Sequence, residues 1–171
     1  MKTVVYLIEK ELRLELRRKA VLSGLALYLF CLVFICYITF SLRQQSVSPA
    51  TWSALYWLVI LFAVVNSVAK SFMGEPKGVL IYYYTLVSPL AIIVSKIIYN
   101  ALLCVVLSFA GYTLFSLFIA DPISDKFIFF ITLIITAVGF AASLSLISAI
   151  ASKANNSYIV MAVLSFPVLI A

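Results

Sequence analysis

The residues best suited to chemistry gather in one polar segment, residues 70–96, which lies between two long apolar stretches. It begins with a turn of charged residues, glycine and proline, and three consecutive tyrosines follow. Because glycine and proline interrupt a helix, the preceding apolar helix cannot run unbroken through this turn. The segment is longer than a turn between two membrane helices requires, and we predict that it contacts something outside the bilayer, through Glu75, Pro76, Lys77, Gly78, Tyr82, Tyr83 and Tyr84.

The three tyrosines allow two interpretations. Tyrosine is enriched where a membrane meets water, so Tyr82 to Tyr84 could belong to an interfacial aromatic belt. They could equally face a protein partner. Neither interpretation of the tyrosines accounts for the turn of glycine and proline before them or for Ser88-Pro89 after them, a pair typical of the start of a new helix.

Polar residues within the apolar stretches are the second set of candidates, because such residues are costly in a membrane. Lys96 and Asn100 are four residues apart and therefore share one face of a helix. Asn66 and Lys70 lie near the end of the preceding apolar stretch. Two roles stay open for Lys96 and Asn100: they line a translocation path, or the lysine extends to the lipid headgroups.

Other chemistry is poorly supported. The sequence contains no histidine, the commonest metal ligand and general base. Cysteines 31, 36 and 104 lie in apolar runs and are predicted to pack there, as are Met73 and Met161, rather than to bind metal or haem. No nucleophile–base pair or pair of carboxylates is visible. We therefore expect no catalytic residue, no metal and no cofactor bound by this chain.

Composition indicates the fold class. Of 171 residues, 65% are hydrophobic and 11% are charged, whereas soluble domains carry about 25% charged residues. Apolar runs of about 20 residues predict membrane-spanning helices. We expect an all-α integral membrane protein, one domain over residues 1–171, with a polytopic bundle of spans at 20–42, 51–72, 90–120, 127–152 and 158–171. The fifth run is short for a span, so we expect the protein to continue beyond residue 171.

The basic residues predict the orientation of the bundle. All but two of the 12 lysines and arginines fall on one side of the predicted spans, and only Arg43 and Lys126 fall on the other. By the positive-inside rule, the N-terminus and segment 73–89 are cytoplasmic. The net charge of +6 then reflects topology, and no nucleic-acid partner is expected.

Residues 1–19 are predicted to form an amphipathic helix at the membrane surface. Val4, Val5, Ile8, Leu12 and Leu16 form one apolar stripe on a helical wheel. The basic residues lie mainly away from that stripe, which is typical of a helix in the headgroup region. Their alternative role is to fix topology by charge alone. The basic residues assigned to this helix are Lys10, Arg13, Arg17 and Arg18.

Together these features resemble a known family. The charged helix ending at Arg18, the Glu75-x-x-Gly78 turn, Ser88-Pro89-Leu90, Ser95-Lys96 and Gly139-Phe140 are similar to the membrane subunits of ABC-2 exporters, and specifically to the haem exporter protein B family of cytochrome c maturation. The resemblance implies six spans in the bacterial cytoplasmic (inner) membrane. It also implies that residues 1–19 are an elbow helix and that 73–89 is a coupling segment resting on a separate ATP-binding subunit.

The resemblance implies partners as well. The sequence has no Gly-x-x-x-x-Gly-Lys-Ser/Thr phosphate loop, so ATP is expected on the ATPase partner. Haem, if a subunit binds it, is expected on a partner, and other cytochrome c maturation membrane proteins and the lipid bilayer are expected neighbours. Two alternatives stay open: an ABC-2 permease for a lipid, polysaccharide or drug, and a membrane scaffold that transports nothing.

Overall fold

The computed structural model describes residues 2–17, 19–41, 47–73, 87–119, 121–154 and 157–170. These residues form helices and contain no strand, which confirms the predicted all-α class. The predicted contact residues Glu75 to Tyr84 lie outside the described residues, and so does Arg18. The helices are α1 (Lys2–Arg17), α2 (Lys19–Ser41), α3 (Pro49–Met73), α5 (Pro89–Ile119), α6 (Lys126–Ala151) and α7 (Ser157–Ile170).

Among the described residues, four helices are long and apolar enough to cross a membrane. Their candidate spans are Ser23–Phe40, Pro49–Ala69, Pro89–Ile119 and Lys126–Ala151. The helix α3 begins at Pro49, two residues before the predicted start at 51, and α2, α5 and α6 each begin one residue early. Helix α7 has 14 residues, which is shorter than the roughly 20 that span a bilayer.

Two of the long helices begin at a Ser-Pro pair. Ser48 precedes α3, and its Oγ accepts a hydrogen bond from the Thr51 backbone N–H at 3.2 Å while its carbonyl accepts one from Trp52 at 2.9 Å. The Ser88 carbonyl likewise accepts from the backbone N–H of Ile92 at the start of α5. Proline suits the first helical position because an N–H there would have no acceptor within the helix. The fixed φ of proline is also close to the helical value.

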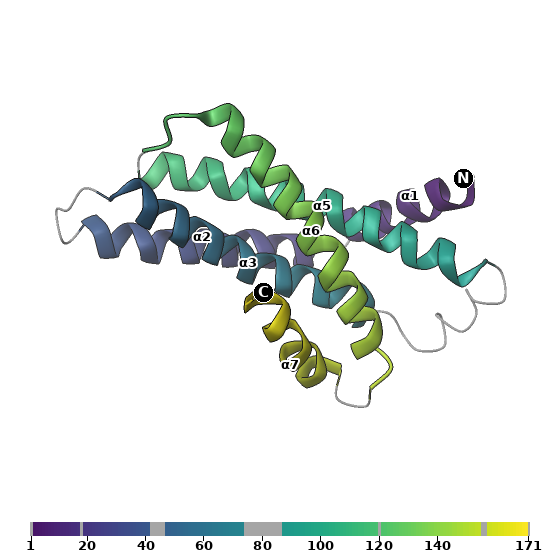
Figure 1. Ribbon diagram of the computed structural model, residues 1–171. Coiled ribbons are helices and arrows are strands. Elements are labelled where there is room, and N and C mark those ends of the chain that lie inside the picture. The colour runs from purple at the N-terminus through teal and green to yellow at the C-terminus, as the bar shows by residue number, and fades with distance from the viewer. Residues whose placement is uncertain are drawn as a thin grey trace.

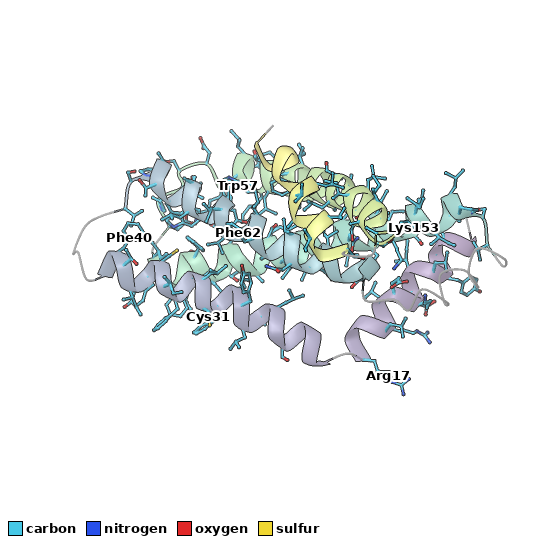
Figure 2. The ribbon with its side chains drawn as sticks, turned by 90° about the horizontal axis from the view of Figure 1, so that it is seen from below. Arg17, Cys31, Phe40, Trp57, Phe62 and Lys153 are labelled. Carbon is cyan, nitrogen blue, oxygen red and sulfur yellow. The ribbon has the colours of Figure 1, made fainter. Side chains whose placement is uncertain are left out.

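The spanning helices run along the length of the molecule, with α3, α5 and α6 packed together and α2 against α3 and α5 (Figure 1). Arg17 and Lys153 lie toward one end of the bundle and Phe40 lies at the other (Figure 2). We call these the Lys153 end and the Phe40 end. Helix α7 turns back against α3 and α6, while α1 leaves the axis of α2 and packs on α5.

The core toward the Phe40 end is aromatic. The Trp52 ring stacks on Tyr56 at 5.5 Å between centroids and meets Phe115 edge-on at 5.5 Å. Tyr112 and Phe129 pack at 5.5 Å beside them. Aromatic pairs of this kind add to the stabilisation from buried area. They join the start of α3, the end of α5 and the start of α6.

Gly111 lets α5 approach α3 closely. A Cβ added at this position would overlap Cδ1 of Ile60, which is 1% exposed, and would lie 3.8 Å from Leu29 Cδ1. Because Ile60 is enclosed on all sides, its side chain has little room to move. The three helices α2, α3 and α5 therefore meet where the sequence supplies glycine.

Replacing Gly111 with alanine tests this contact. We expect Gly111→Ala to lower the free energy of unfolding by about 1–3 kcal/mol, the usual cost of overpacking a core. The measurement is the midpoint of thermal unfolding in detergent. Gly139→Ala is the matched control, because a Cβ at Gly139 of α6 meets nothing within 4 Å. Equal stability of the two variants would contradict a tight contact at Gly111.

Candidate functional site

The predicted apolar stripe of helix α1 is partly buried against the bundle and partly exposed. Val4, Ile8 and Leu12 are partly buried on the side that packs against α5, while Val5 is 63% exposed. Glu11 shares the packed side, since it follows Ile8 by three residues and precedes Leu12. The Glu11 carboxylate therefore lies in the contact between α1 and the bundle.

That carboxylate meets Lys96. The Lys96 side chain is 2% exposed, and its Nζ lies 3.7 Å from Oε1 of Glu11. Lys10 Nζ lies 3.2 Å from the same oxygen. A buried ammonium is costly unless an opposite charge and hydrogen bonds compensate it. This pair ties α1 to the first turns of α5, and its ammonium has a counter-ion within the protein.

Hydrogen bonds continue this polar contact into the bundle. Asn100, one turn after Lys96 and 1% exposed, donates from Nδ2 to Ser145 Oγ at 2.8 Å. Ser148, on the same face of α6, donates from Oγ to the Val68 carbonyl at 3.4 Å. We call Glu11, Lys96, Asn100, Ser145 and Ser148 the polar junction. It connects α1, α5, α6 and α3 through buried side chains toward the Lys153 end.

The predicted site residues separate into groups. Lys96 and Asn100 lie on one buried face, and Lys10 reaches the junction through Glu11. Arg13 and Arg17 are exposed on the other side of α1. Asn66 is exposed and donates to its own helix, at the Phe62 carbonyl. Sequence reasoning missed three junction residues, Glu11, Ser145 and Ser148; the signal for Glu11 was a carboxylate at the edge of the apolar stripe.

A second charged group lies beyond the opposite end of α5. Asp121 Oδ2 accepts a hydrogen bond from the Tyr112 hydroxyl at 2.6 Å and lies 3.2 Å from Lys126 Nζ, and its Oδ1 accepts from the Ile123 N–H. Burial alone would raise the pKa of Asp121. The hydrogen bonds from Tyr112 and Ile123, together with the charge of Lys126, outweigh burial and hold that pKa below its ordinary value of 3.8. Asp121 thus fastens the connection between α5 and α6 in its ionised form.

Neither group resembles a metal or catalytic centre. Among the residues that the structure describes, no three His, Cys, Asp or Glu side chains come close enough to hold a metal ion. Cys104 and Met161 are buried in the hydrophobic core. The polar junction holds helices in a fixed relation, because an ion pair joins α1 to α5 and hydrogen bonds join α5 to α6 and α6 to α3.

Removing the carboxylate tests the junction. We expect Glu11→Gln to lower the free energy of unfolding by about 3 kcal/mol, since it removes a carboxylate that faces the buried Lys96 ammonium. The measurement is thermal or denaturant unfolding in detergent. The double variant Glu11→Gln/Lys96→Met should recover much of the loss because it also removes the buried positive charge.

Glu9→Gln is the matched control on the same helix. Glu9 pairs with Arg13, but the two side chains are 50% and 78% exposed, and an exposed pair contributes about 1 kcal/mol or less. If Glu11→Gln were no more destabilising than Glu9→Gln, the buried pair would have no structural role.

Asp121 makes a prediction about pH. Its lowered pKa in the folded state means that its stabilisation is complete above the ordinary value of 3.8 and is lost as the pH falls through the lower folded value. Asp121→Asn should therefore unfold at a lower temperature than wild type at pH 7, and the difference should shrink in acid below pH 3.8. Asp125→Asn is the control, because Asp125 makes no side-chain capping bond. A difference that persists unchanged in acid would contradict the ionised contact.

Comparison with known proteins adds one result. A model of the CcmB protein family matches residues 2–171. No curated protein and no solved structure matches the chain. The matched region includes α1, all four candidate spans and α7.

Proposed function

The chain belongs to the CcmB protein family, and we propose that it is the permease subunit of an ABC-type exporter that serves cytochrome c maturation by delivering haem across the cytoplasmic membrane. The observation that carries the proposal is the family match over residues 2–171. The bundle supports it, since four helices are long and apolar enough to span a membrane. In this proposal a separate ATPase subunit drives the permease.

The coupling segment is the proposed contact with that ATPase. Helix α3 ends at Met73 and α5 begins at Pro89, so residues 73–89 connect two helices of the central bundle. A push on this segment would reach both helices directly, and rigid-body movement of packed helices is a common way to transmit such a signal. The proposed contact residues are Glu75 to Gly78, and Tyr82 to Tyr84 stay predicted contacts with either lipid or the ATPase.

The polar junction fits this coupling role. Lys96 lies in the first turns of α5, close in sequence to the coupling segment, and its ion pair joins α5 to α1. Helix α1 would therefore move together with α5 when the segment is displaced. A direct part in translocation for Lys96 and Asn100 stays a prediction from the sequence.

Haem is the proposed cargo, and ATP is the proposed ligand of the partner. The sequence has no histidine, and the described Cys104 and Met161 are core residues, so axial ligation by this chain has little support. We therefore propose that a partner subunit handles haem, among other cytochrome c maturation membrane proteins. We also propose the bacterial inner membrane as the location and the cytoplasm as the side of the N-terminus, from the distribution of basic residues.

A deletion strain tests the function. Loss of this chain should abolish covalent haem attachment to cytochromes c, and the wild-type chain should restore it, as read by haem staining of periplasmic proteins. Charge reversal by Glu75→Lys should weaken copurification of the ATPase subunit severalfold, because a docking carboxylate is replaced by a cation. Normal holocytochrome levels in the deletion strain would disprove a role in cytochrome c maturation.

The control is a charge reversal at the opposite end, Asp125→Lys, in the exposed connection before α6. It should leave ATPase copurification unchanged. If Glu75→Lys leaves ATPase yield and activity intact while the deletion still abolishes holocytochrome, Glu75 has no coupling role and the family function stands.

A further inference from the structure

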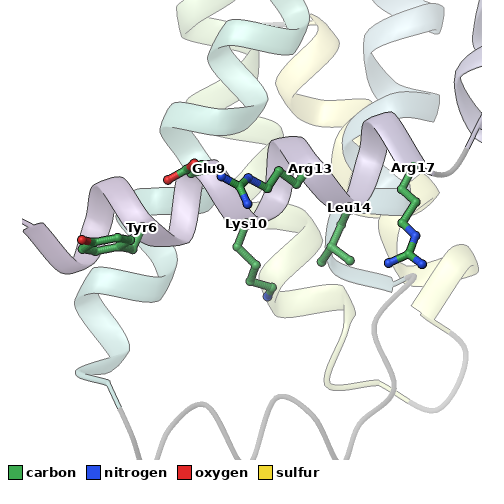
Figure 3. Close-up of a pocket in the computed structure, with 6 residues that line it drawn as sticks. All are labelled: Tyr6, Glu9, Lys10, Arg13, Leu14 and Arg17. Carbon is green, nitrogen blue, oxygen red and sulfur yellow. Dashed lines mark hydrogen bonds and ion pairs between the residues drawn. The ribbon is translucent and has the colours of Figure 1, made fainter.

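The outward face of α1 carries a shallow cavity of about 430 Å³ (Figure 3). It is on the side of the helix away from the residues that pack on α5. Figure 3 shows Glu9 and Arg13 meeting, and Lys10, Leu14 and Arg17 extending along the same length of helix. The residues that line this cavity are Tyr6, Glu9, Lys10, Arg13, Leu14 and Arg17. We call it the α1 cavity.

The lining has the chemistry of an anion site. Of the described residues that line it, three are basic and one is acidic, so their summed charge is positive. Arg13 and Arg17 are one helical turn apart, so both can act on the same group once the Arg13 guanidinium, which extends toward Glu9 in Figure 3, leaves that partner. Arg13 pairs with Glu9, but both side chains are largely exposed, and such a pair exchanges readily for another anion. A guanidinium binds phosphate through two parallel hydrogen bonds.

The same cavity offers apolar surface. Tyr6 is 71% exposed and Leu14 is 39% exposed. Val5, beside Tyr6, is 63% exposed and extends the apolar edge. A free phosphate would leave this surface unused, whereas a lipid would cover it with its glycerol and upper acyl chain. Tyrosine beside basic residues is typical of the headgroup layer of a membrane.

The location of α1 agrees with this chemistry. It ends at Arg17, and the candidate span of α2 starts at Ser23, six residues later in the chain. The cavity is thus held near the depth at which a spanning helix enters the bilayer. Basic residues at that depth attract anionic lipids. We propose that the α1 cavity is a binding site for the headgroup of an anionic phospholipid, with its phosphate on Arg13 and Arg17.

Lys10 connects this lipid site to the polar junction. Its Nζ lies 3.2 Å from Glu11 Oε1, the atom that also faces Lys96, and its side chain lines the cavity. A phosphate in the cavity competes with Glu11 for Lys10. The Glu11 carboxylate then interacts more strongly with Lys96. Occupancy by lipid therefore strengthens the attachment of α1 to α5. The proposal requires a membrane location for α1 but does not depend on haem export.

Lipid binding to the full chain tests the proposal. The protein is placed in nanodiscs of phosphatidylcholine with phosphatidylglycerol, and lipids that stay bound after release are counted by native mass spectrometry. Wild type should retain phosphatidylglycerol preferentially. Arg13→Gln/Arg17→Gln should lose that preference by about fivefold for each arginine at low salt, the effect expected of one basic residue at an anionic surface. Lys153→Gln, an exposed cation at the same end of the bundle, is the matched control and should keep it.

A thermal measurement separates binding from folding. Phosphatidylglycerol added in detergent should raise the unfolding midpoint of wild type, because a ligand of the folded state stabilises it, and should raise that of Arg13→Gln/Arg17→Gln much less. Equal phosphatidylglycerol retention in wild type and the double variant would overturn the proposal, as would an equal loss in Lys153→Gln. Stabilisation by inorganic phosphate alone would overturn the lipid assignment. So would a double variant that keeps its lipid but loses a copurifying protein partner.

Discussion

One buried charge organises the Lys153 end of the molecule. Lys96 lies within a helix that is otherwise apolar enough to span a membrane, and its side chain is 2% exposed. An ammonium in such surroundings requires an opposite charge, because the lost hydration is worth several kcal/mol. Glu11 supplies it, and α1 must therefore lie along α5 rather than apart from the bundle. Together with the partly buried Val4, Ile8 and Leu12, this pair keeps one face of α1 on α5 and leaves the basic face and the α1 cavity on the other side.

The two ends of the bundle are stabilised in different ways. Toward the Phe40 end, stacked and edge-on aromatic rings fill the space among α3, α5 and α6, and Asp121 fastens the connection that follows α5. Toward the Lys153 end, the hydrogen bonds from Asn100 to Ser145 and from Ser148 to the Val68 carbonyl replace them. A hydrogen bond depends on direction, and its donor can change from one acceptor to another. Aromatic packing instead resists displacement because the rings bury a large surface area. The proposed coupling segment adjoins the end held by directional contacts.

Much of the fold could be predicted from local features. Apolar runs defined the spans, since about 20 residues are needed to cross a bilayer, and serine before proline defined the starts of α3 and α5. The family could also be recognised from short charged and glycine-containing motifs, and the match over residues 2–171 confirms it. For the site, the shared face of Lys96 and Asn100 followed from their spacing alone.

The sequence by itself determined which segments are long and apolar enough to span a membrane and which face of α1 is basic, because hydropathy and helical periodicity depend only on neighbouring residues. Only the tertiary structure decided that Glu11 faces Lys96, that Asn100 meets Ser145, and that Gly111 lies against Ile60. These contacts join helices far apart along the chain, and their partners depend on how the helices are rotated and shifted against each other. Rotation of a packed helix is set by the sum of all its contacts, so no local pattern can specify it.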